Sequence, residues 1–254
     1  MNQILLSSKI PDSSRKLKII PEAVSYSDAE IRDKLLQLDK TCCVVKNGDA
    51  VGVCLEEDAD ESSSGTSMSL LAQALPLKTT QLGDPEFIKV HGLKMAYMTG
   101  SMANGIASEN LVIPSGKVGL LSSFGAAGLL PSRIEQAINI IQKALPDGPY
   151  AFNLIHSPSE DAIERAAVDL YLKYGVRTVE ASAFLGLTPN IVRYRVAGLR
   201  RSAQNQVEIT NRVIAKISRA EVASKFMAPA PEAMLNKLLE ERSITREQAQ
   251  LAAA

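Results

Sequence analysis

The sequence predicts an α/β protein with a parallel sheet, and three observations carry that prediction. From Leu93 onward, short apolar runs alternate with amphipathic segments of about 10–15 residues, as in chains built from βα units. Gly and Ser bound the apolar runs, which is typical of strands buried on both faces. The segment between the first two runs, residues 102–115, is too long for a hairpin and predicts a crossover between parallel neighbours.

About five βα units can be assigned in this part of the chain. The first crossover has helix-compatible residues at 106–109, Pro131 suits the first turn of a helix, and Gly175 is a predicted C-cap. Such a sheet is either open and doubly wound or closed as a barrel, and five units fall short of the eight of a (β/α)8 barrel. The predicted strands are 95–99, 118–123, 150–155, 176–181 and 213–217, and the predicted helices are 132–144, 160–174, 188–198 and one from Arg219.

The chain before residue 83 has a different texture and predicts a small α+β region. Residues 28–38 place apolar side chains at helical spacing, with Ser27 as the cap. Strands at 41–46 and 50–55 flank Asn47-Gly48, a strong hairpin signal. The acidic, serine-rich stretch 56–67 predicts a solvated loop.

We therefore divide the chain into three parts. Residues 1–83 form the N-terminal α+β region, and residues 84–228 contain the βα units. After Pro229 and Pro231 the strand pattern stops, and residues 229–254 predict a helical segment. Its two helices are expected at 232–240 and 245–253.

Composition restricts the function classes. The 28 Lys and Arg residues balance 28 Asp and Glu residues, which argues against a general nucleic-acid or anionic-membrane binder. No run approaches the ~20 apolar residues of a membrane span, and the first residues lack a signal-peptide pattern, so we expect a cytoplasmic protein. Cys42, Cys43 and Cys54 lack a second pair or nearby histidines, so we expect buried strand residues and no metal site.

Two loops of small residues form the candidate ligand site. They are residues 100–105 and 124–128, which follow the first two predicted strands of the parallel sheet. Loops at the carboxyl ends of parallel strands bind ligands in α/β folds, and small residues let a flat ligand lie against the backbone. Their glycines do not have dinucleotide-binding spacing, and the chain has no P-loop, nucleophile elbow or zinc helix.

Four polar residues near strand ends are further candidates. Asn153 and Glu180 interrupt or end apolar strands, and they either bind a ligand or hydrogen-bond neighbouring loops. His156 is a possible proton donor or a turn residue, and Lys216 either faces an anionic ligand or extends to solvent. A basic cluster after the fourth strand either attracts an acidic carrier domain or is a solvated face: Arg193, Arg195, Arg200 and Arg201.

Four collinear strings carry a resemblance that runs from about residue 83 to the end. They are MAYMTGSMANGIASENLVIPSGKVGLLSSFGAAGLLP (95–131), AFNLIHSP (151–158), VEASAFLGLTPNIVRYR (179–195) and ISRAEVASKFMAPAP (217–231). In these strings the chain resembles the PfaD-type enoyl reductases of polyunsaturated-fatty-acid synthases and trans-acyltransferase polyketide synthases. These enzymes belong to the wider nitronate monooxygenase-like flavin class.

The resemblance implies a (β/α)8 TIM barrel that binds FMN, uses NAD(P)H as reductant and reduces an enoyl thioester. Residues 84–228 are then the first part of a TIM-barrel flavin domain, and residues 229–254 are the start of a helical insertion. The substrate would be carried on the acyl carrier protein of a polyketide or fatty acid synthase, and a homodimer is possible.

The resemblance also implies roles for individual residues. Flavin N5 would deliver hydride to the β-carbon, an acid would protonate the α-carbon, and the protein would orient both. Carried over by position, the flavin-binding residues are Ala103, Asn104, Gly105, Ile106, Asn153, Glu180 and Lys216.

One departure from the family shapes the expectation for this chain. Family members are longer, and an H-T-D-N-R-P-like segment that holds an active-site histidine does not occur here, which leaves His156 as a weak catalytic candidate. We therefore expect an N-terminal fragment, a truncated reading frame or one half of a split enzyme. Two alternatives are a flavin enzyme with nitronate or other oxidative chemistry, and an inactive half-barrel that serves as a scaffold or docking piece.

Overall fold

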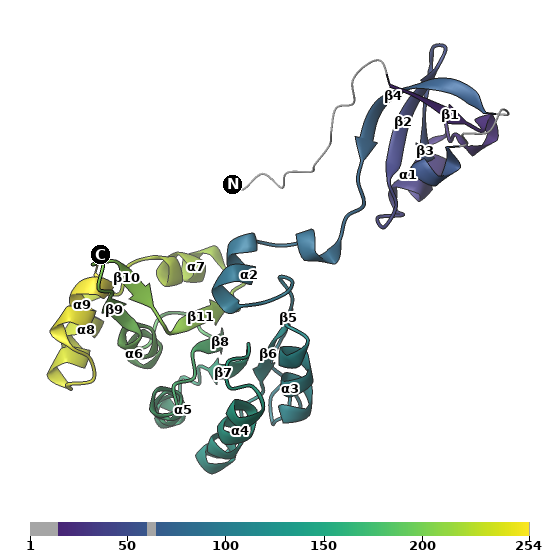
Figure 1. The fold of residues 1–254 in the computed structure, drawn as a ribbon. Coiled ribbons are helices and arrows are strands. Elements are labelled where there is room, and N and C mark those ends of the chain that lie inside the picture. Colours follow the sequence, from purple (N-terminus) through teal and green to yellow (C-terminus); the bar gives the residue numbers. More distant parts are fainter. Residues whose placement is uncertain (1–14, 60–64, 254) are drawn as a thin grey trace. The chain divides into compact units, whose positions relative to one another are not determined.

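The structure is a computed structural model that describes residues 15–59 and 65–253. The chain forms two compact units, one ending at Leu82 and the other beginning at Gly83 (Figure 1). Each unit has its own hydrophobic core, so each is described separately.

The first unit is an antiparallel sheet with one helix, α1 (Asp28–Leu35). The predicted hairpin is confirmed, because β2 and β3 pair antiparallel and Asn47 lies opposite Ala50. Ser27 caps α1 as predicted by accepting a hydrogen bond from the backbone N–H of Glu30. In the order β1-β4-β2-β3, the strands are β1 (Lys16–Ile19), β4 (Thr66–Ala74), β2 (Cys42–Asn47) and β3 (Ala50–Leu55).

Strand β4 was not predicted, although it pairs with both β1 and β2. Its serines and threonine continue the polar texture of the predicted loop 56–67, and that loop prediction is wrong from Thr66 onward. Glu56–Asp58 forms the short 3₁₀ turn η2, and residues 60–64 of the predicted loop lie outside the described residues. The three cysteines are buried free thiols, as expected.

The second unit contains a five-stranded sheet in which every neighbouring pair is parallel. The sheet curls as part of a TIM-like barrel, with helices along its outer face (Figure 1). This confirms the predicted fold class. In the order β11-β8-β7-β6-β5, the strands are β11 (Arg212–Ala215), β8 (Thr178–Ser182), β7 (Ala151–Ile155), β6 (Leu121–Phe124) and β5 (Met98–Thr99).

Aromatic and aliphatic side chains fill the space between the sheet and its helices. Phe152 of β7 and Tyr171 of α5 are fully buried there, and their ring centroids lie 5.6 Å apart. The Tyr171 hydroxyl donates a 2.6 Å hydrogen bond to the backbone oxygen of Asn153, and burial raises the pKa of this tyrosine. The covering helices are α3 (Glu109–Lys117), α4 (Pro131–Ala144), α5 (Asp161–Lys173), α6 (Pro189–Ala197) and α7 (Ala220–Met227).

The first crossover differs from the prediction. Helix α3 begins at Glu109, where the predicted helical stretch ends, and it continues through Pro114 to Lys117. Proline and glycine are poor helix formers, so local preference disfavours this helix. Burial of Val112 and Gly116 outweighs that preference. The strands on either side are shorter than predicted: β5 has only two residues, and β6 begins at Leu121 rather than at residue 118.

Further elements close the second unit. Helix α2 (Pro85–His91) contributes Phe87 and Ile88 to an apolar cluster at the strand starts, with Leu121 and Ala151. A hairpin after α6 was not predicted, because its few apolar residues are separated by charged ones; it pairs β9 (Leu199–Arg201) with β10 (Val207–Ile209). The predicted C-terminal helices are present as α8 (Glu232–Glu240) and α9 (Arg246–Ala252), and they join the main core.

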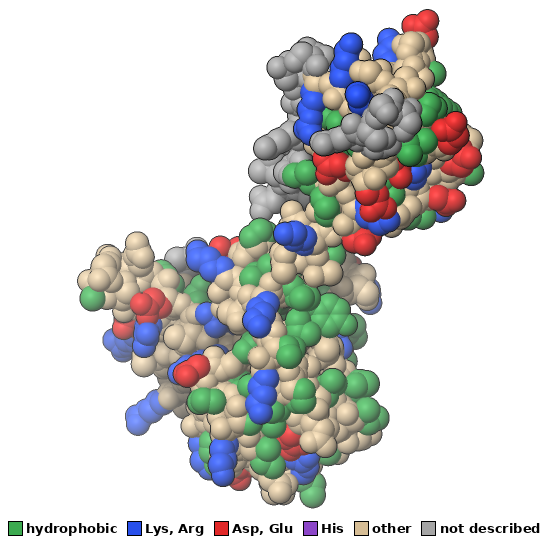
Figure 2. All heavy atoms as spheres, turned by 45° about the vertical axis from the view of Figure 1, so that its right-hand side comes forward, with side chains coloured by type: hydrophobic (Ala, Val, Ile, Leu, Met, Phe, Trp, Pro, Cys, Tyr) green, Lys and Arg blue, Asp and Glu red, His purple; other side chains and the backbone are tan. Residues whose placement is uncertain are grey.

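The surface and helix lengths bear on the possible functions. Figure 2 shows Lys and Arg side chains spaced singly over the visible face of the second unit, separated by neutral and hydrophobic side chains.

Of the helices that the structure describes, none has the length and apolar character needed to cross a bilayer. Within residues 15–59 and 65–253, no group of three or more His, Cys, Asp or Glu side chains could hold a metal ion.

Candidate functional site

Glu180 is the centre of a polar cluster inside the curve of the second sheet. It lies on β8, and its side chain is 1% exposed. Its Oε2 atom accepts a 2.8 Å hydrogen bond from the backbone N–H of Ser101, which follows β5. Its Oε1 atom lies 2.8 Å from Nζ of Lys216, which follows β11. Because β5 and β11 are the two ends of the strand order, Glu180 joins loops from opposite edges of the sheet.

The surroundings of Glu180 keep its carboxylate ionised. Burial alone would raise the pKa of Glu180, but Lys216, the nearby Ser123 hydroxyl and the Ser101 N–H together lower it below its ordinary value. The Lys216 side chain is about half exposed, at 51%. A cation is therefore held by a buried carboxylate while it remains accessible from the open end of the strands.

Asn153 lies beside Glu180 and connects β7 to β8. The two residues are in register on neighbouring strands, and Asn153 is buried. Its Nδ2 atom donates hydrogen bonds to the backbone oxygen of Glu180 at 3.1 Å and to Oγ of Ser182 at 2.9 Å. Side chains alternate along a strand, so Asn153 faces the inside of the curve while Phe152 and Leu154 pack toward the helices. The amide thus supports the scaffold and also borders the candidate ligand site.

Two adjacent serines on β6 differ in their hydrogen bonding, although both are fully buried. The Thr99 hydroxyl donates a 2.5 Å hydrogen bond to Oγ of Ser122. Ser123 is close enough to Glu180 to lower its pKa, yet within the described part of the chain its Oγ finds no hydrogen bond of good geometry. A buried hydroxyl whose only polar contact has poor geometry is unfavourable, so Ser123 is a candidate ligand contact that sequence reasoning missed.

The two small-residue loops are fastened to each other by backbone hydrogen bonds. The N–H of Asn104 donates to the oxygen of Ala127 at 2.8 Å, and the N–H of Gly105 donates to the oxygen of Gly125 at 2.9 Å. Asn104 and Gly105 are both left-handed, with φ of 54° and 70°. At Gly125 a Cβ atom would lie 1.7 Å from the backbone oxygen of Met102, so only glycine allows this approach.

The structure brings three of the predicted ligand residues together, whereas the other four lie in or directly after the first small-residue loop. Asn153, Glu180 and Lys216 form one connected cluster, which reaches the first loop through Ser101. Ala103, Asn104 and Ile106 lie further along that loop and are exposed, with Ile106 at 68%, while Gly105 is half-buried. Among the hydrogen bonds of the described residues, none joins these four residues to Asn153, Glu180 or Lys216.

His156 belongs to a different cluster, on the helix side of β7. Its Nδ1 atom lies 3.0 Å from Oε2 of Glu164, a carboxylate that is 1% exposed. The Thr188 hydroxyl donates to the other oxygen of Glu164, and the His156 ring stacks on Phe184 at 5.2 Å. This arrangement ties β7 to α5, to α6 and to the loop after β8. Sequence reasoning missed Glu164, whose only signal is a carboxylate on the apolar stripe of α5.

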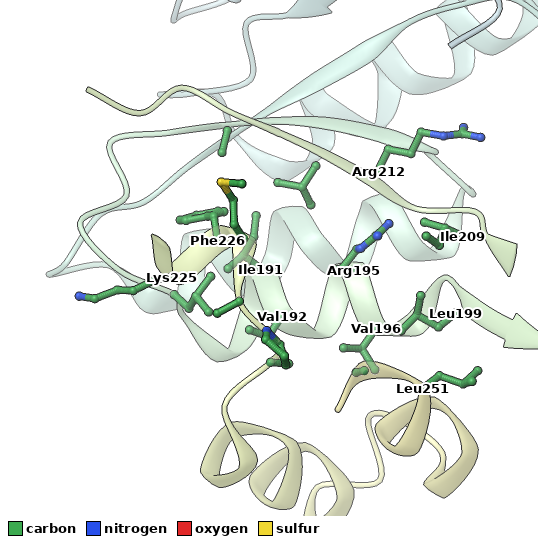
Figure 3. A pocket seen from close by; sticks show the side chains of 18 of the residues that line it. Ile191, Val192, Arg195, Val196, Leu199, Ile209, Arg212, Lys225, Phe226 and Leu251 are labelled. Carbon is green, nitrogen blue, oxygen red and sulfur yellow. The ribbon is translucent and has the colours of Figure 1, made fainter. Parts of the chain in front are cut away.

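The basic cluster seen in the sequence is divided in the structure. Arg193 pairs with Asp169 at 2.6 Å, and Arg200 pairs with Glu208 at 2.6 Å. Arg201 bonds to Asn205, a neighbour on the same hairpin. Arg195 instead extends from α6 toward β11 (Figure 3) and donates to the backbone oxygen of residue 211 at 2.7 Å. The four side chains therefore do not share one surface that could attract an acidic carrier domain.

Comparisons with known proteins find similarity to polyunsaturated fatty acid synthase and polyketide biosynthesis proteins in both units of the chain. Residues 20–76 match the family described as the fatty acid synthase subunit PfaD N-terminal domain. The chain is 42% identical over 252 residues to a polyunsaturated fatty acid synthase subunit of Thraustochytrium sp., covering 97% of this chain and 16% of that protein. It is 45% identical over 171 residues to polyketide biosynthesis protein PksE of Bacillus subtilis, covering 67% of this chain and 22% of that protein.

A solved structure extends the similarity to the fold. The enoyl reductase domain of MlnA, from the macrolactin biosynthesis cluster of Bacillus amyloliquefaciens, aligns with a TM-score of 0.66 and 37% sequence identity. The alignment covers 69% of this chain and 40% of that domain. The chain therefore spans 16% and 22% of the two curated relatives named here, and less than half of the solved domain.

Proposed function

This chain belongs to the PfaD-type family of enoyl reductase-like proteins, and we propose that its second unit forms one wall of an FMN site in such a reductase. The observation that carries the proposal is the Glu180 cluster, which holds Lys216 at the carboxyl ends of parallel strands. Ligands bind at this end of the sheet in barrels of this type. The two fastened loops of small residues lie at the same end.

The residues at this site fit a flavin. An isoalloxazine ring is flat, and the exposed residues Ala103 and Asn104 offer a surface of small side chains, flanked by the larger exposed side chains of Met102 and Ile106. The polar edge of the ring carries both hydrogen-bond acceptors and an N–H donor. Lys216 is a donor facing the opening, and the orphaned Ser123 hydroxyl can both donate and accept. The Asn153 oxygen is a further acceptor, because the hydrogen bonds of that side chain use its nitrogen.

The roles of the protein groups follow from their contacts. FMN held at this site would supply the two-electron chemistry between NAD(P)H and an enoyl thioester. Lys216 would supply positive charge beside the ring and so favour its reduced, more electron-rich form. Glu180 positions Lys216 and the Ser101 backbone rather than reacting itself. The role of His156 as a proton donor stays a prediction, and its ring contacts the carboxylate of Glu164.

The substrate and partners follow from the named relatives. Polyunsaturated fatty acid synthase subunits and polyketide biosynthesis proteins are similar to this chain, so we propose that the enoyl group is carried on an acyl carrier protein of such a synthase. Homodimer formation is part of the same proposal and follows only from the family resemblance.

The proposal is tested by titrating the chain into FMN and into riboflavin and following flavin fluorescence. We assign the residues named above to the ring and none of them to the phosphate, so we expect both flavins to be quenched with similar dissociation constants. Lys216→Met should weaken both by about tenfold, the effect of one hydrogen bond from a charged group. Lys225→Met, a matched substitution on α7, should leave both unchanged. Absence of quenching at millimolar flavin, or equal effects of the two variants, would overturn the proposal.

A further inference from the structure

Cys43 and Cys54 lie opposite each other in the core of the first unit. They are directly paired residues of β2 and β3 in the antiparallel register. Both are 0% exposed, and both belong to the apolar cluster of this unit. Side chains alternate along a strand, so Cys42, which pairs with Leu55, points to the other face of the sheet. The two thiols that share one face are therefore those of Cys43 and Cys54.

The spacing of this pair is within the range that a disulfide spans. The backbone N–H and oxygen of Val53 bond to Ser25, on the far side of β3 from β2. Hydrogen-bonding direction alternates along a strand, so Cys54 bonds toward β2 and forms a hydrogen-bonded pair with Cys43. The Cα atoms of such a pair lie about 5.5 Å apart, and disulfides join Cα atoms roughly 4.4–6.8 Å apart. The Cβ atoms must approach each other by about 1 Å, so the bond would be strained and readily reduced.

Polar contacts distinguish the two thiols. The Cys54 thiol donates a hydrogen bond to the sulfur of Cys43 and thereby lowers the pKa of Cys43, although burial opposes this effect. The same hydrogen bond and burial raise the pKa of Cys54. The Gln73 amide is a second donor, with Nε2 3.8 Å from Sγ of Cys43 and 2.9 Å from Oε1 of Glu56. The thiolate is the reactive form of cysteine, so Cys43 is the nucleophile of the pair.

The pair lies close to the open end of the hairpin. Strand β2 begins at Cys42 and β3 ends at Leu55, one residue from each of the paired cysteines. Strand ends open locally at a smaller free energy than the whole fold requires. Both thiols are covered in the closed structure, so an oxidant meets them during such openings, and a small molecule needs the least opening.

We propose that Cys43 and Cys54 are a site of reversible oxidation, at which hydrogen peroxide converts the two thiols into a disulfide between β2 and β3. The Cys43 thiolate attacks one peroxide oxygen, the O–O bond breaks, and the departing hydroxide takes up the proton that Cys43 released. The sulfur of Cys54 then attacks the sulfenic acid of Cys43, the S–O bond breaks, and the hydroxyl leaves as water with the proton of Cys54. The two sulfurs lose two electrons, which reduce the peroxide to two waters.

The first test treats the unaltered chain with hydrogen peroxide and then alkylates the remaining thiols. We expect the chain to lose the mass of two hydrogen atoms, and peptide mapping to find a bond between Cys43 and Cys54 with Cys42 alkylated. Dithiothreitol should restore all three thiols. Cys42→Ser is the matched control and should change the disulfide yield by less than about twofold. A bond to Cys42, a bond between two copies of the chain, or added oxygen that dithiothreitol does not remove would overturn the proposal.

The second test concerns the order of the two steps. Cys54→Ser keeps a hydroxyl donor beside Cys43 but cannot form the disulfide, so the sulfenic acid should persist and dimedone should label Cys43 at least about fivefold more than in the unaltered chain. Cys43→Ser should give no comparable label on Cys54, whose thiol ionises less readily. Amide exchange of Met68, in the same core, shows whether both variants are folded. Equal labelling of the two folded variants would contradict the roles assigned to the two thiols.

Discussion

The two units of the chain differ in what they bury. Of the ten buried polar or charged side chains among the described residues, Ser25 and Gln73 lie in the first unit and the other eight lie in the second. The second unit also contains both buried carboxylates, Glu164 and Glu180. Burying charge is unfavourable unless partners compensate it, so a fold that needs only stability has little use for these groups. We therefore expect ligand chemistry in the parallel-sheet unit, where Glu180 lies, and a scaffold role for the antiparallel unit.

The largest expected effect comes from removing the Glu180 side chain. Glu180→Ala leaves Lys216 without its counter-charge and Ser101 without its acceptor, and we expect the second unit to lose about 3 kcal/mol of stability. Amide exchange in β7 and β8 measures this loss, and β2 and β3 should be unaffected. Glu221→Ala breaks an exposed pair with Arg219 and should change stability by less than about 0.5 kcal/mol. Equal losses in both units would remove the distinction between them.

The next largest effect on stability is expected from replacing a glycine in each unit by alanine. Gly125→Ala places a Cβ atom against the backbone oxygen of Met102, and we expect a loss of about 2 kcal/mol because backbone must move. Gly48→Ala, in the hairpin turn of the first unit, meets no atom within 4 Å and should lose about 1 kcal/mol through its positive φ alone. Urea unfolding of the two variants compares them. A greater loss for Gly48→Ala contradicts the tight contact between the two loops.

A smaller effect is expected from acid. The pKa of Glu180 is lowered in the folded chain, so its stabilisation is complete above the unfolded-state pKa, about 4.3, and is lost as pH falls through the folded-state value. Amide exchange in β8 between about pH 6 and 3.5, a range that begins above that unfolded-state value, should show this decline. Glu180→Gln does not titrate and should flatten it. An identical decline in the variant would show that other carboxylates, such as Glu109 beside Arg133, are responsible.

The smallest effect separates the two serines of β6. Ser122→Ala removes the acceptor of the Thr99 hydroxyl and should lower stability by about 1 kcal/mol. Ser123→Ala removes a hydroxyl that lacks a well-formed hydrogen bond, and stability should stay within about 0.5 kcal/mol of the unaltered chain. Thermal unfolding measures both. If Ser123→Ala were the more destabilising change, Ser123 would be a structural group rather than a ligand contact.

Periodicity was sufficient to predict most of the fold. The five parallel strands and helices such as α4 and α5 follow from apolar runs and 3.6-residue spacing. Strand β4 and the start of α3 were missed, because their local composition favours other structures and tertiary packing overrides it. Spacing identified Asn153, Glu180 and Lys216 as strand-end residues. It could not pair Glu180 with Ser101, which is 79 residues away, or identify Ser123 as an unpartnered hydroxyl, since both depend on how the sheet curls.

The fastened loops affect how a ligand is received. Asn104 and Gly105 are held in left-handed conformations by backbone hydrogen bonds to Ala127 and Gly125. Fixing the backbone of one residue costs about 1–2 kcal/mol of conformational entropy. In these loops the backbone is already fixed when the chain folds, so this entropy loss does not reduce the free energy of ligand binding. A flat ring then meets a surface that is already ordered. Its binding should proceed in a single fast phase, at a rate that rises linearly with ligand concentration.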